Sequence, residues 1–318
     1  MSAYFAYQVQ LADAPSVRHK VIKWHPKFKD IFAVGSCDER GDGGEINLFD
    51  DEGQKVKGSN NSLKKPTAKP LQLAWHPTKK ILAVAWSTGL INVWNCAKNK
   101  AHNVGRRNDN QKSWFNLGHE VYVISGAVDL EINNVQWSSE GSKLLVTDRA
   151  GDVFLHKIDL KGRPVDNGTT KTKLKEPISC VLLKPPFDVH KDSGNAAPPE
   201  DALNEFRTKR AVIAPAESST FFLGGETGGI YFVKENGQVN EMFTLNKCVM
   251  FLTFSAKNNI LICISNDLML SRHQISASSS SDATEMSKVK INAKLEKLNI
   301  LPIRDNVLAI SCGELSVR

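Results

Sequence analysis

Two copies of the tripeptide Trp-His-Pro, Trp24-His25-Pro26 and Trp75-His76-Pro77, contain the residues with the clearest potential for chemistry. A repeated imidazole could bind a metal ion or transfer protons. A zinc site, however, needs a second His or Cys two to five residues away, and neither His25 nor His76 has one. Both histidines precede proline directly after an apolar run. We therefore interpret them as turn residues that hydrogen-bond to nearby main chain, beside tryptophans that pack between repeated structural units.

Other motifs typical of enzymes are either absent or lie in sequence surroundings that do not suit catalysis. No G-x-S-x-G nucleophile elbow is present. The glycine-rich stretch Gly35–Glu45 lacks the G-x-x-x-x-G-K-[ST] pattern and opens no helix, so a hairpin loop is the better interpretation than a phosphate-binding loop. The paired acids of Asp148–Asp152 fit a hairpin in which Asp and Gly supply the turn geometry. We expect no enzyme activity, no catalytic residue, no metal and no cofactor.

The composition is that of a folded globular protein. Of 318 residues, 41% are hydrophobic and 24% are charged, with a net charge of +7 and a pI near 9.0. Such an excess could suit nucleic acid or an anionic lipid surface. The cations are dispersed, in modest clusters at Lys27–Lys29, Lys64-Lys65 and Arg106-Arg107. We therefore expect no nucleic-acid partner, and a peripheral membrane contact stays open.

No targeting or membrane-spanning segment is apparent. No apolar run approaches the ~20 residues that span a bilayer, and the first 16 residues lack a basic region followed by an apolar one. A cytoplasmic location follows as an expectation. The cysteines form no C-x-x-C pair and several fall in apolar runs, so we expect buried, reduced thiols. They are Cys37, Cys96, Cys180, Cys248, Cys263 and Cys312.

An internal repeat organises the whole chain. Its frame is a small residue, Gly or Asp, any residue, and then alternating apolar positions that end on a bulky one. The second positions of successive frames lie 45, 62, 77, 39 and 46 residues apart, which indicates a base period near 40 to 45 with insertions in two units. The six frames begin at Gly43, Thr88, Ala150, Thr227, Asn266 and Cys312.

Each frame follows two shorter apolar runs of four to six residues. Turn-forming residues separate the runs, and glycine, proline and asparagine arrive too often for helices of ten or more residues. A period of 40 to 45 with several short strands per unit is typical of a propeller blade. We predict an all-β, WD40-type β-propeller. The blade cores are expected near residues 21–50, 71–96, 131–160, 177–240, 248–275 and 295–318.

Three polar segments interrupt the period without destroying it. Residues 97–120, 185–212 and 276–287 are predicted to be loops projecting from the repeats, and the last contains the serine tract Ser276–Ser281. One short helix is expected within an insertion, over Pro198–Ile213, because a proline start, early acids and later bases suit a helix. The polar serine tract makes phosphorylation conceivable from composition alone.

The repeats resemble WD40 repeats, most closely in the stretch LAWHPTKKILAVAWSTGLINVWN, although only Trp94 supplies the terminal tryptophan and no copy ends in Trp-Asp. In order and over nearly the whole chain, the segments WHP…FAV, DRAGDVFLHKIDLKGRP, GGIYFVKENGQV and VKINAKLEKLNILPIRDNVLAISCGELSVR are similar to the amino-terminal propeller of the intraflagellar transport protein 140 family. The structural repeat markers that this interpretation assigns are Trp24, His25, Pro26, Trp75, His76, Pro77, Gly89, Trp94, Trp137, Gly151, Gly228 and Gly313.

The resemblance implies a scaffold without a catalytic site. Its partners would be the other subunits of intraflagellar transport complex A and ciliary membrane cargo or adaptors, and its location the cilium, the ciliary basal body and the cytoplasm. The alternative is a WD40 subunit of a vesicle-coat or phosphoinositide-binding trafficking complex. About six blades are visible where seven are expected, so residues 1–318 are predicted to be one incomplete domain, poorly stable alone.

Overall fold

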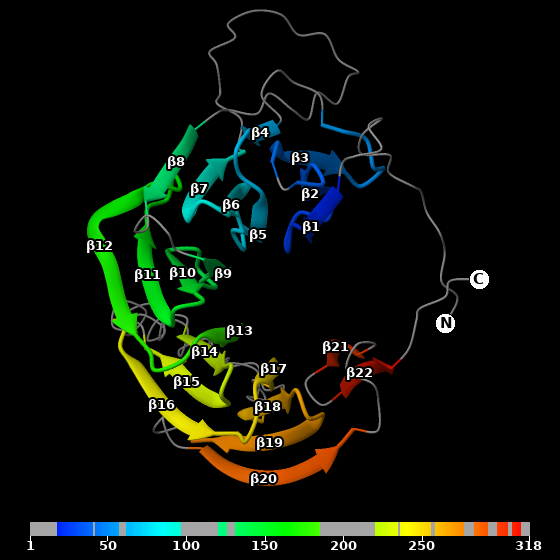
Figure 1. Cartoon of the computed structure of the whole chain (residues 1–318), viewed down its shortest axis with the longest axis vertical. Coiled ribbons are helices and arrows are strands. Elements are labelled where there is room, and N and C mark those ends of the chain that lie inside the picture. Colours follow the sequence, from blue (N-terminus) through cyan, green and yellow to red (C-terminus); the bar gives the residue numbers. More distant parts are fainter. Residues whose placement is uncertain are drawn as a thin grey trace, which may run out of the picture. The chain divides into compact units, whose positions relative to one another are not determined.

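The computed structural model describes residues 18–40, 42–56, 62–96, 120–125, 131–184, 220–234, 236–255, 258–276, 283–291, 298–304 and 307–312. The regular structure in these residues consists of short antiparallel β-strands (Figure 1). By their packing the strands divide into two compact units, Met1–Lys173 (unit 1) and Leu174–Arg318 (unit 2). Each unit is described below by itself.

Unit 1 holds three four-stranded sheets, each a simple meander of neighbours. In sequence order, the strands of the first sheet are β1 (Arg18–Trp24), β2 (Ile31–Cys37), β3 (Gly44–Asp50) and β4 (Ser62–Lys65). The second sheet contains β5 (Pro70–Trp75), β6 (Ile81–Trp86), β7 (Leu90–Asn95) and β8 (Glu120–Ser125). The third contains β9 (Ile132–Trp137), β10 (Lys143–Asp148), β11 (Asp152–Ile158) and β12 (Pro164–Lys173).

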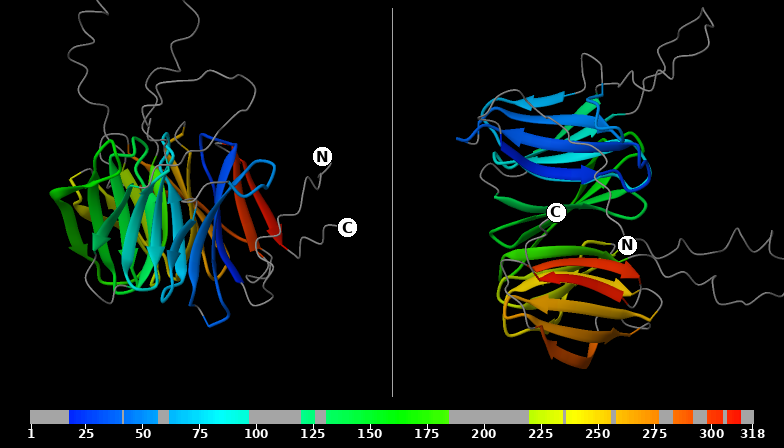
Figure 2. Two further views of the ribbon diagram at one scale, coloured as in Figure 1. Left: turned by 90° about the horizontal axis from the view of Figure 1, so that it is seen from above. Right: turned by 90° about the vertical axis from the view of Figure 1, so that its right-hand side faces the viewer.

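Unit 2 holds two further four-stranded sheets and one pair of strands. The fourth sheet contains β13 (Ile178–Lys184), β14 (Thr220–Gly225), β15 (Gly229–Val233) and β16 (Val239–Thr244). The fifth contains β17 (Val249–Ser255), β18 (Ile260–Ser265), β19 (Met269–Ile275) and β20 (Ala283–Lys290). The remaining pair is β21 (Leu298–Arg304) with β22 (Val307–Cys312). Figure 2 shows the strands of each sheet side by side with the usual twist.

The three strands predicted in each of the first five repeats are confirmed, but the fourth was missed. In the sixth repeat the first two predicted strands are β21 and β22, and the third lies outside the described residues. Two of the missed fourth strands, Pro164–Lys173 and Ala283–Lys290, are mostly polar and exposed. They join the sheet through main-chain pairing with the third strand, which leaves no apolar alternation in the sequence. The loop predicted over 276–287 is therefore wrong in its second half, because β20 begins at Ala283.

Glycine enables the tight turns between second and third strands. Gly89, Gly151 and Gly228 have φ values of 74°, 84° and 108°, in the left-handed region that disfavours other residues. At Gly228 a side chain would also collide with the main-chain oxygen of Leu245. The glycines that mark the repeat in the sequence are therefore turn residues, as the frame predicted.

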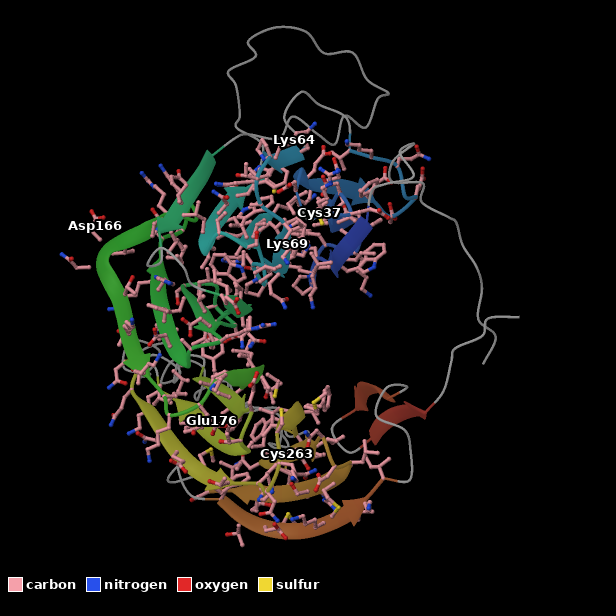
Figure 3. All side chains as sticks on the ribbon, in the orientation of Figure 1. Cys37, Lys64, Lys69, Asp166, Glu176 and Cys263 are labelled. Atoms are coloured by element: carbon pink, nitrogen blue, oxygen red, sulfur yellow. The ribbon has the colours of Figure 1, made fainter. Side chains whose placement is uncertain are left out.

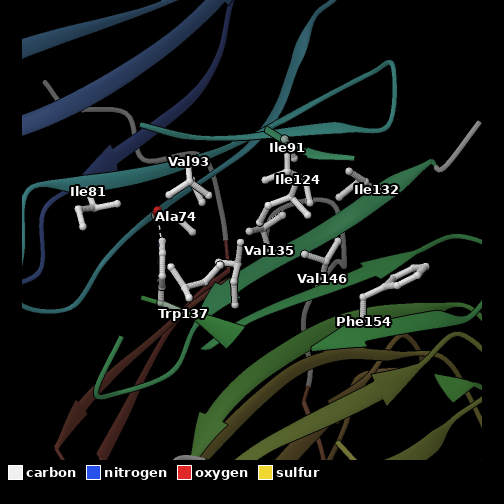
Figure 4. Close-up of a cluster of buried hydrophobic side chains, with 14 residues drawn as sticks. Ala74, Ile81, Ile91, Val93, Ile124, Ile132, Val135, Trp137, Val146 and Phe154 are labelled. Atoms are coloured by element: carbon white, nitrogen blue, oxygen red, sulfur yellow. Dashed lines mark hydrogen bonds between the residues drawn. The ribbon is translucent and has the colours of Figure 1, made fainter. Parts of the chain in front are cut away.

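The apolar core lies between adjacent sheets within each unit. In unit 1, alternate residues of β6 point to opposite sides: Ala83 packs with the third sheet and Leu82 with the first. Figure 4 shows the cluster between the second and third sheets, where Trp137, which is 2% exposed, points toward Ala74. In unit 2, Phe222, Phe232 and Leu261 form the corresponding cluster. Sheet-on-sheet packing explains why the strands are apolar on both faces.

Several predictions fall outside the described residues. These include the insertion at 185–212 with its helix over Pro198–Ile213, residues 97–119 of the first insertion, residues 277–281 of the serine tract, and Gly313. Of the cysteines, Cys37, Cys96, Cys180, Cys248 and Cys263 are free thiols, and Cys37, Cys96 and Cys263 are buried. Burial raises the pKa of the Cys180 thiol to about 12, which leaves it protonated and a poor nucleophile at neutral pH.

Candidate interaction surface

The tryptophans at the ends of the first strands fasten neighbouring sheets of unit 1. The indole Nε1 of Trp75 donates to the carbonyl of Lys23 at 2.9 Å, and Nε1 of Trp137 donates to the carbonyl of Ala74 at 2.9 Å. Each acceptor belongs to the preceding sheet. It is the residue immediately before the tryptophan that ends the first strand of that sheet, Trp24 or Trp75. The same bond therefore recurs at two successive sheet interfaces. Figure 4 shows the second of these as a dashed line.

The histidines hold the adjoining turns together. Nδ1 of His25 accepts hydrogen bonds from the amides of Lys27 and Phe28 at 3.0 Å, while Nε2 lies 2.8 Å from the carbonyl of Lys79 in the next sheet. His76 repeats the arrangement: Nδ1 accepts from the amides of its own turn at 3.1 Å, and the ring bonds to the main chain of Gly141 in the third sheet. Both imidazoles therefore have main-chain partners.

These contacts require neutral rings. Burial lowers the pKa of His76 to about 4, with smaller contributions from the nearby Lys79 and His25, and burial also lowers the pKa of His25. At neutral pH each Nδ1 is thus free to accept and each Nε2 carries the proton that it donates. In this arrangement the imidazoles brace the turns and are not placed to act as metal ligands.

The remaining sequence markers have structural positions. Trp94 and Trp137 are buried, and the prolines Pro26 and Pro77 follow the two turn histidines. Trp24 differs from the other first-strand tryptophans because it is 50% exposed and packs against Phe32, with ring centroids 4.4 Å apart and the ring planes tilted by 36°. No three His, Cys, Asp or Glu side chains among the described residues group as a metal site. No helix in this part of the chain could cross a membrane.

A hairpin at the same end of unit 1 carries the most exposed large apolar side chain of the residues that the structure describes. Residues 159–163 connect β11 to β12, and Leu160 at the tip is 83% exposed. In a four-stranded meander the first and third turns lie at the same end, so this hairpin shares an end with the histidine turns. Lys79 of the His76 turn makes the contact directly, because its Nζ donates to the carbonyl of Leu160 at 2.7 Å.

Asp159 fixes the shape of this hairpin. Its Oδ1 accepts from the amides of Lys161 and Arg163 at 2.8 Å, and its Oδ2 lies 3.0 Å from Nε of Arg163. Slight burial raises the pKa of the carboxyl, but the two amides and the guanidinium outweigh it, and the net pKa is lowered. Gly162, with φ of 91°, closes the turn through its amide and the carbonyl of Asp159 at 3.1 Å.

Unit 2 contains a buried carboxylate with a different role. Glu176, 5% exposed, lies before β13 and holds the turn between β14 and β15 (Figure 3). It accepts from the amide and hydroxyl of Thr227, the amide of Gly229 at 3.0 Å and the hydroxyl of Tyr231 at 2.7 Å. Burial raises the carboxyl pKa, but these donors more than compensate and lower it overall. No local sequence motif marks Glu176 as a turn-binding residue, because its partners lie about 50 residues away.

Four-stranded antiparallel meanders that pack sheet against sheet define the WD40-type β-propeller class. The solved structures agree on the fold. A chain of the Mitotic Checkpoint Complex crystal structure matches with a TM-score of 0.56 at 14% identity, covering 94% of this chain and 76% of that one. The β-propeller domain of Cps50 (Swd1) from Myceliophteria thermophila matches with a TM-score of 0.51 at 10% identity, covering 89% and 75%.

The family is established by the sequence match. Residues 2–318 match the family described as IFT140 first beta-propeller, and the chain belongs to that family. The resemblance found in the order of the repeat motifs is therefore confirmed.

Proposed function

We propose that this chain is a non-catalytic interaction propeller of intraflagellar transport complex A, which serves retrograde transport and cargo entry in cilia. Membership of the family of first IFT140 propellers carries the proposal. Its partners are the other complex A subunits and ciliary membrane cargo or adaptors, and it acts in the cilium, at the basal body and in the cytoplasm. The function lies in the exposed surfaces of the propeller and not in bond-making chemistry.

The arrangement of polar side chains supports a scaffold. The carboxylates, imidazoles and hydroxyls with the tightest contacts, such as Glu176, His25 and Ser179, bind main-chain groups of neighbouring strands or turns. A residue committed to main-chain donors and acceptors serves the fold. Several exposed apolar side chains, in contrast, lie on a hairpin tip or on last strands, where a partner can reach them, as Leu160, Val165 and Val289 do.

Affinity purification of the complete protein from ciliated cells, followed by quantitative mass spectrometry, tests the proposal. The other complex A subunits are expected in stoichiometric amounts, and they should persist after a wash at 0.3 M salt. Recovery of the intact, folded protein without these subunits would refute the assignment.

The basic excess of +7 motivates the second candidate, a phosphoinositide-binding or coat-associated propeller. Flotation of the same protein with vesicles containing phosphoinositides tests this candidate. Lipid recognition should weaken steeply with salt, because it rests on Lys and Arg near an anionic surface. Strong salt-sensitive flotation together with absence of complex A subunits would favour the second candidate over the first.

A further inference from the structure

We propose that the hairpin tip at Leu160 is an anchor by which this propeller binds another subunit of its complex, through an apolar pocket rimmed by carboxylates on that subunit. The inference rests on the proposed function and adds the surface and the chemistry of the partner. Three observations carry it: the exposure of Leu160, the rigidity of the main chain beneath it and the charge around it.

Leu160 is unusual among the exposed apolar residues. Its side chain is 83% exposed, whereas the other large apolar side chains that are exposed range from 46% to 58%. They also lie on strands, where a neighbouring side chain covers one flank. Leu160 instead lies in the turn between β11 and β12, at the tip of a hairpin. The comparison residues are Ile22, Trp24, Val123, Val165, Met250, Met286 and Val289.

The main chain that carries Leu160 is held on both sides. From its own hairpin, Asp159 binds the amides of Lys161 and Arg163. From the second sheet, Lys79 binds the carbonyl of Leu160 at 2.7 Å and Asn95 Nδ2 binds the carbonyl of Lys161 at 3.1 Å. An exposed leucine would otherwise lose conformational freedom on binding. A backbone fixed before association lowers that cost, which is a property of anchor residues in interfaces.

The hairpin packs on the second sheet as well as bonding to it. A Cβ atom at Gly162 would approach Ile81 at 3.3 Å and Val93 at 3.4 Å, so the turn lies directly on their side chains. Ile81 and Val93 belong to the buried cluster between the second and third sheets. The orientation of Leu160 is therefore coupled to the core of unit 1.

The charge around the tip selects the partner. Lys79, Lys161 and Arg163 contribute three positive charges against the single carboxylate of Asp159, a net +2. Carboxylates on the rim of a pocket complement this charge and exclude partners with a basic rim. An anionic membrane is the weaker match, because one leucine and a net +2 fall short of the two strong signals that stable membrane attachment needs.

The experiment compares variants of the complete protein, co-expressed with the other complex A subunits and purified through a tag on this protein. Leu160→Asp removes the apolar anchor and adds a repulsive charge. Val289→Asp is the matched control, because Val289 is an exposed apolar residue on β20 of unit 2. Leu160→Ala tests the apolar contact without a new charge, and Lys161→Glu tests the charge alone. Thermal unfolding of each variant establishes that it is folded.

Leu160→Asp is expected to lower the recovery of one subunit at least 10-fold, Leu160→Ala about 3- to 10-fold, and Lys161→Glu about 3-fold with a reduced salt dependence. Val289→Asp is expected to leave recovery unchanged. Normal recovery with Leu160→Asp, or an equal loss with Val289→Asp, overturns the anchor while the proposed function stands. Absence of the subunits from the wild-type preparation overturns the proposed function itself, and with it the partner named here.

Flotation with vesicles that contain phosphatidylserine tests whether the hairpin binds an anionic membrane and not a protein subunit. The wild-type protein and Leu160→Asp are expected to float equally with these vesicles. A loss of flotation confined to Leu160→Asp would make a membrane the partner of the hairpin, and the inference would be wrong.

Discussion

Unit 1 and unit 2 stack their four-stranded sheets with different chemistry. In unit 1 the fastening groups are indoles at the ends of first strands, as in the bond from Trp137 to Ala74. In unit 2 the group that joins the sheets is a hydroxyl at the start of a first strand: Ser179 Oγ donates its single proton toward the carbonyl of Val249 at 2.5 Å and also lies 2.9 Å from the carbonyl oxygen of Gly224 in its own sheet. Adjacent sheets are thus joined at the end of the first strand in unit 1 and at the start of the first strand in unit 2.

The difference follows from the residues available at matching positions. Trp75 pairs with the second residue of the strand that follows, and the residues in that register in unit 2 are Leu183 and Phe254. Neither side chain has a ring N–H to donate. Ser179 instead lies at the register shift between Ile178 and Cys180, where the extra residue of a β-bulge can point its side chain to the next sheet. The repeated tryptophan in the sequence therefore marks only one of the two kinds of hydrogen bond that join adjacent sheets.

The largest effect is expected from Trp137→Ala, which removes a buried ring together with the bond to Ala74. We expect the free energy of unfolding to fall by about 3 to 5 kcal/mol, the usual cost of removing a large buried aromatic side chain. Phe254→Ala in unit 2 is expected to cost about 1 to 3 kcal/mol, because Phe254 is only partly buried. Urea denaturation of both variants measures the loss in free energy of unfolding. Equal losses would contradict the difference in sheet packing between the two units.

Glu176→Ala is expected to lower the free energy of unfolding by about 2 to 3 kcal/mol, because the buried amide of Gly229 and the hydroxyl of Tyr231 lose their acceptor. Since the folded pKa of Glu176 is lowered, its contribution is present above the unfolded pKa near 4.3 and lost as the pH falls through the folded pKa. Glu176→Gln keeps the shape without the charge. Wild-type stability in either variant would contradict the claim that the Glu176 carboxylate stabilises unit 2.

The pH dependence of unit 1 is expected to depend on His76. Its pKa is about 4 in the folded state and about 6.5 when unfolded, so the unfolded chain binds more protons between these values. Stability is therefore complete above pH 6.5 and falls as the pH is lowered toward 4, by at most about 1.4 kcal/mol per pH unit. His76→Asn retains an acceptor for the turn but cannot titrate. Urea midpoints from pH 4 to 7 should be flatter for this variant, and identical profiles would contradict the prediction.

The smallest effect on stability is expected from Leu160→Asp. The side chain is almost fully exposed, so the change should alter the free energy of unfolding by no more than about 0.5 kcal/mol. Thermal unfolding in parallel with Trp137→Ala provides the comparison. A loss above 1 kcal/mol would mean that Leu160 belongs to the packing of unit 1 and is not reserved for a partner.

Much of the fold could be predicted because burial leaves a periodic pattern. Apolar runs such as Ile81–Trp86 are buried on both faces and therefore consist almost wholly of apolar residues. The outer strand Pro164–Lys173 could not be predicted, because main-chain pairing holds it and its side chains face solvent. Asp166 on this strand points away from the sheet (Figure 3). The turn role of His25 and His76 was predictable from the following proline and the missing ligand partners.

By itself, the sequence determined the repeat, the turn glycines such as Gly151, the family and the likeness of the two Trp-His-Pro segments, because each is a local pattern of residue types. Only the tertiary structure decided that Trp137 reaches Ala74 across 63 residues, that Glu176 holds a turn about 50 residues away, and that Leu160 stands exposed on a braced hairpin. The physical reason is that hydrogen bonds between sheets join residues distant along the chain. Spacing along a sequence carries no information on such contacts.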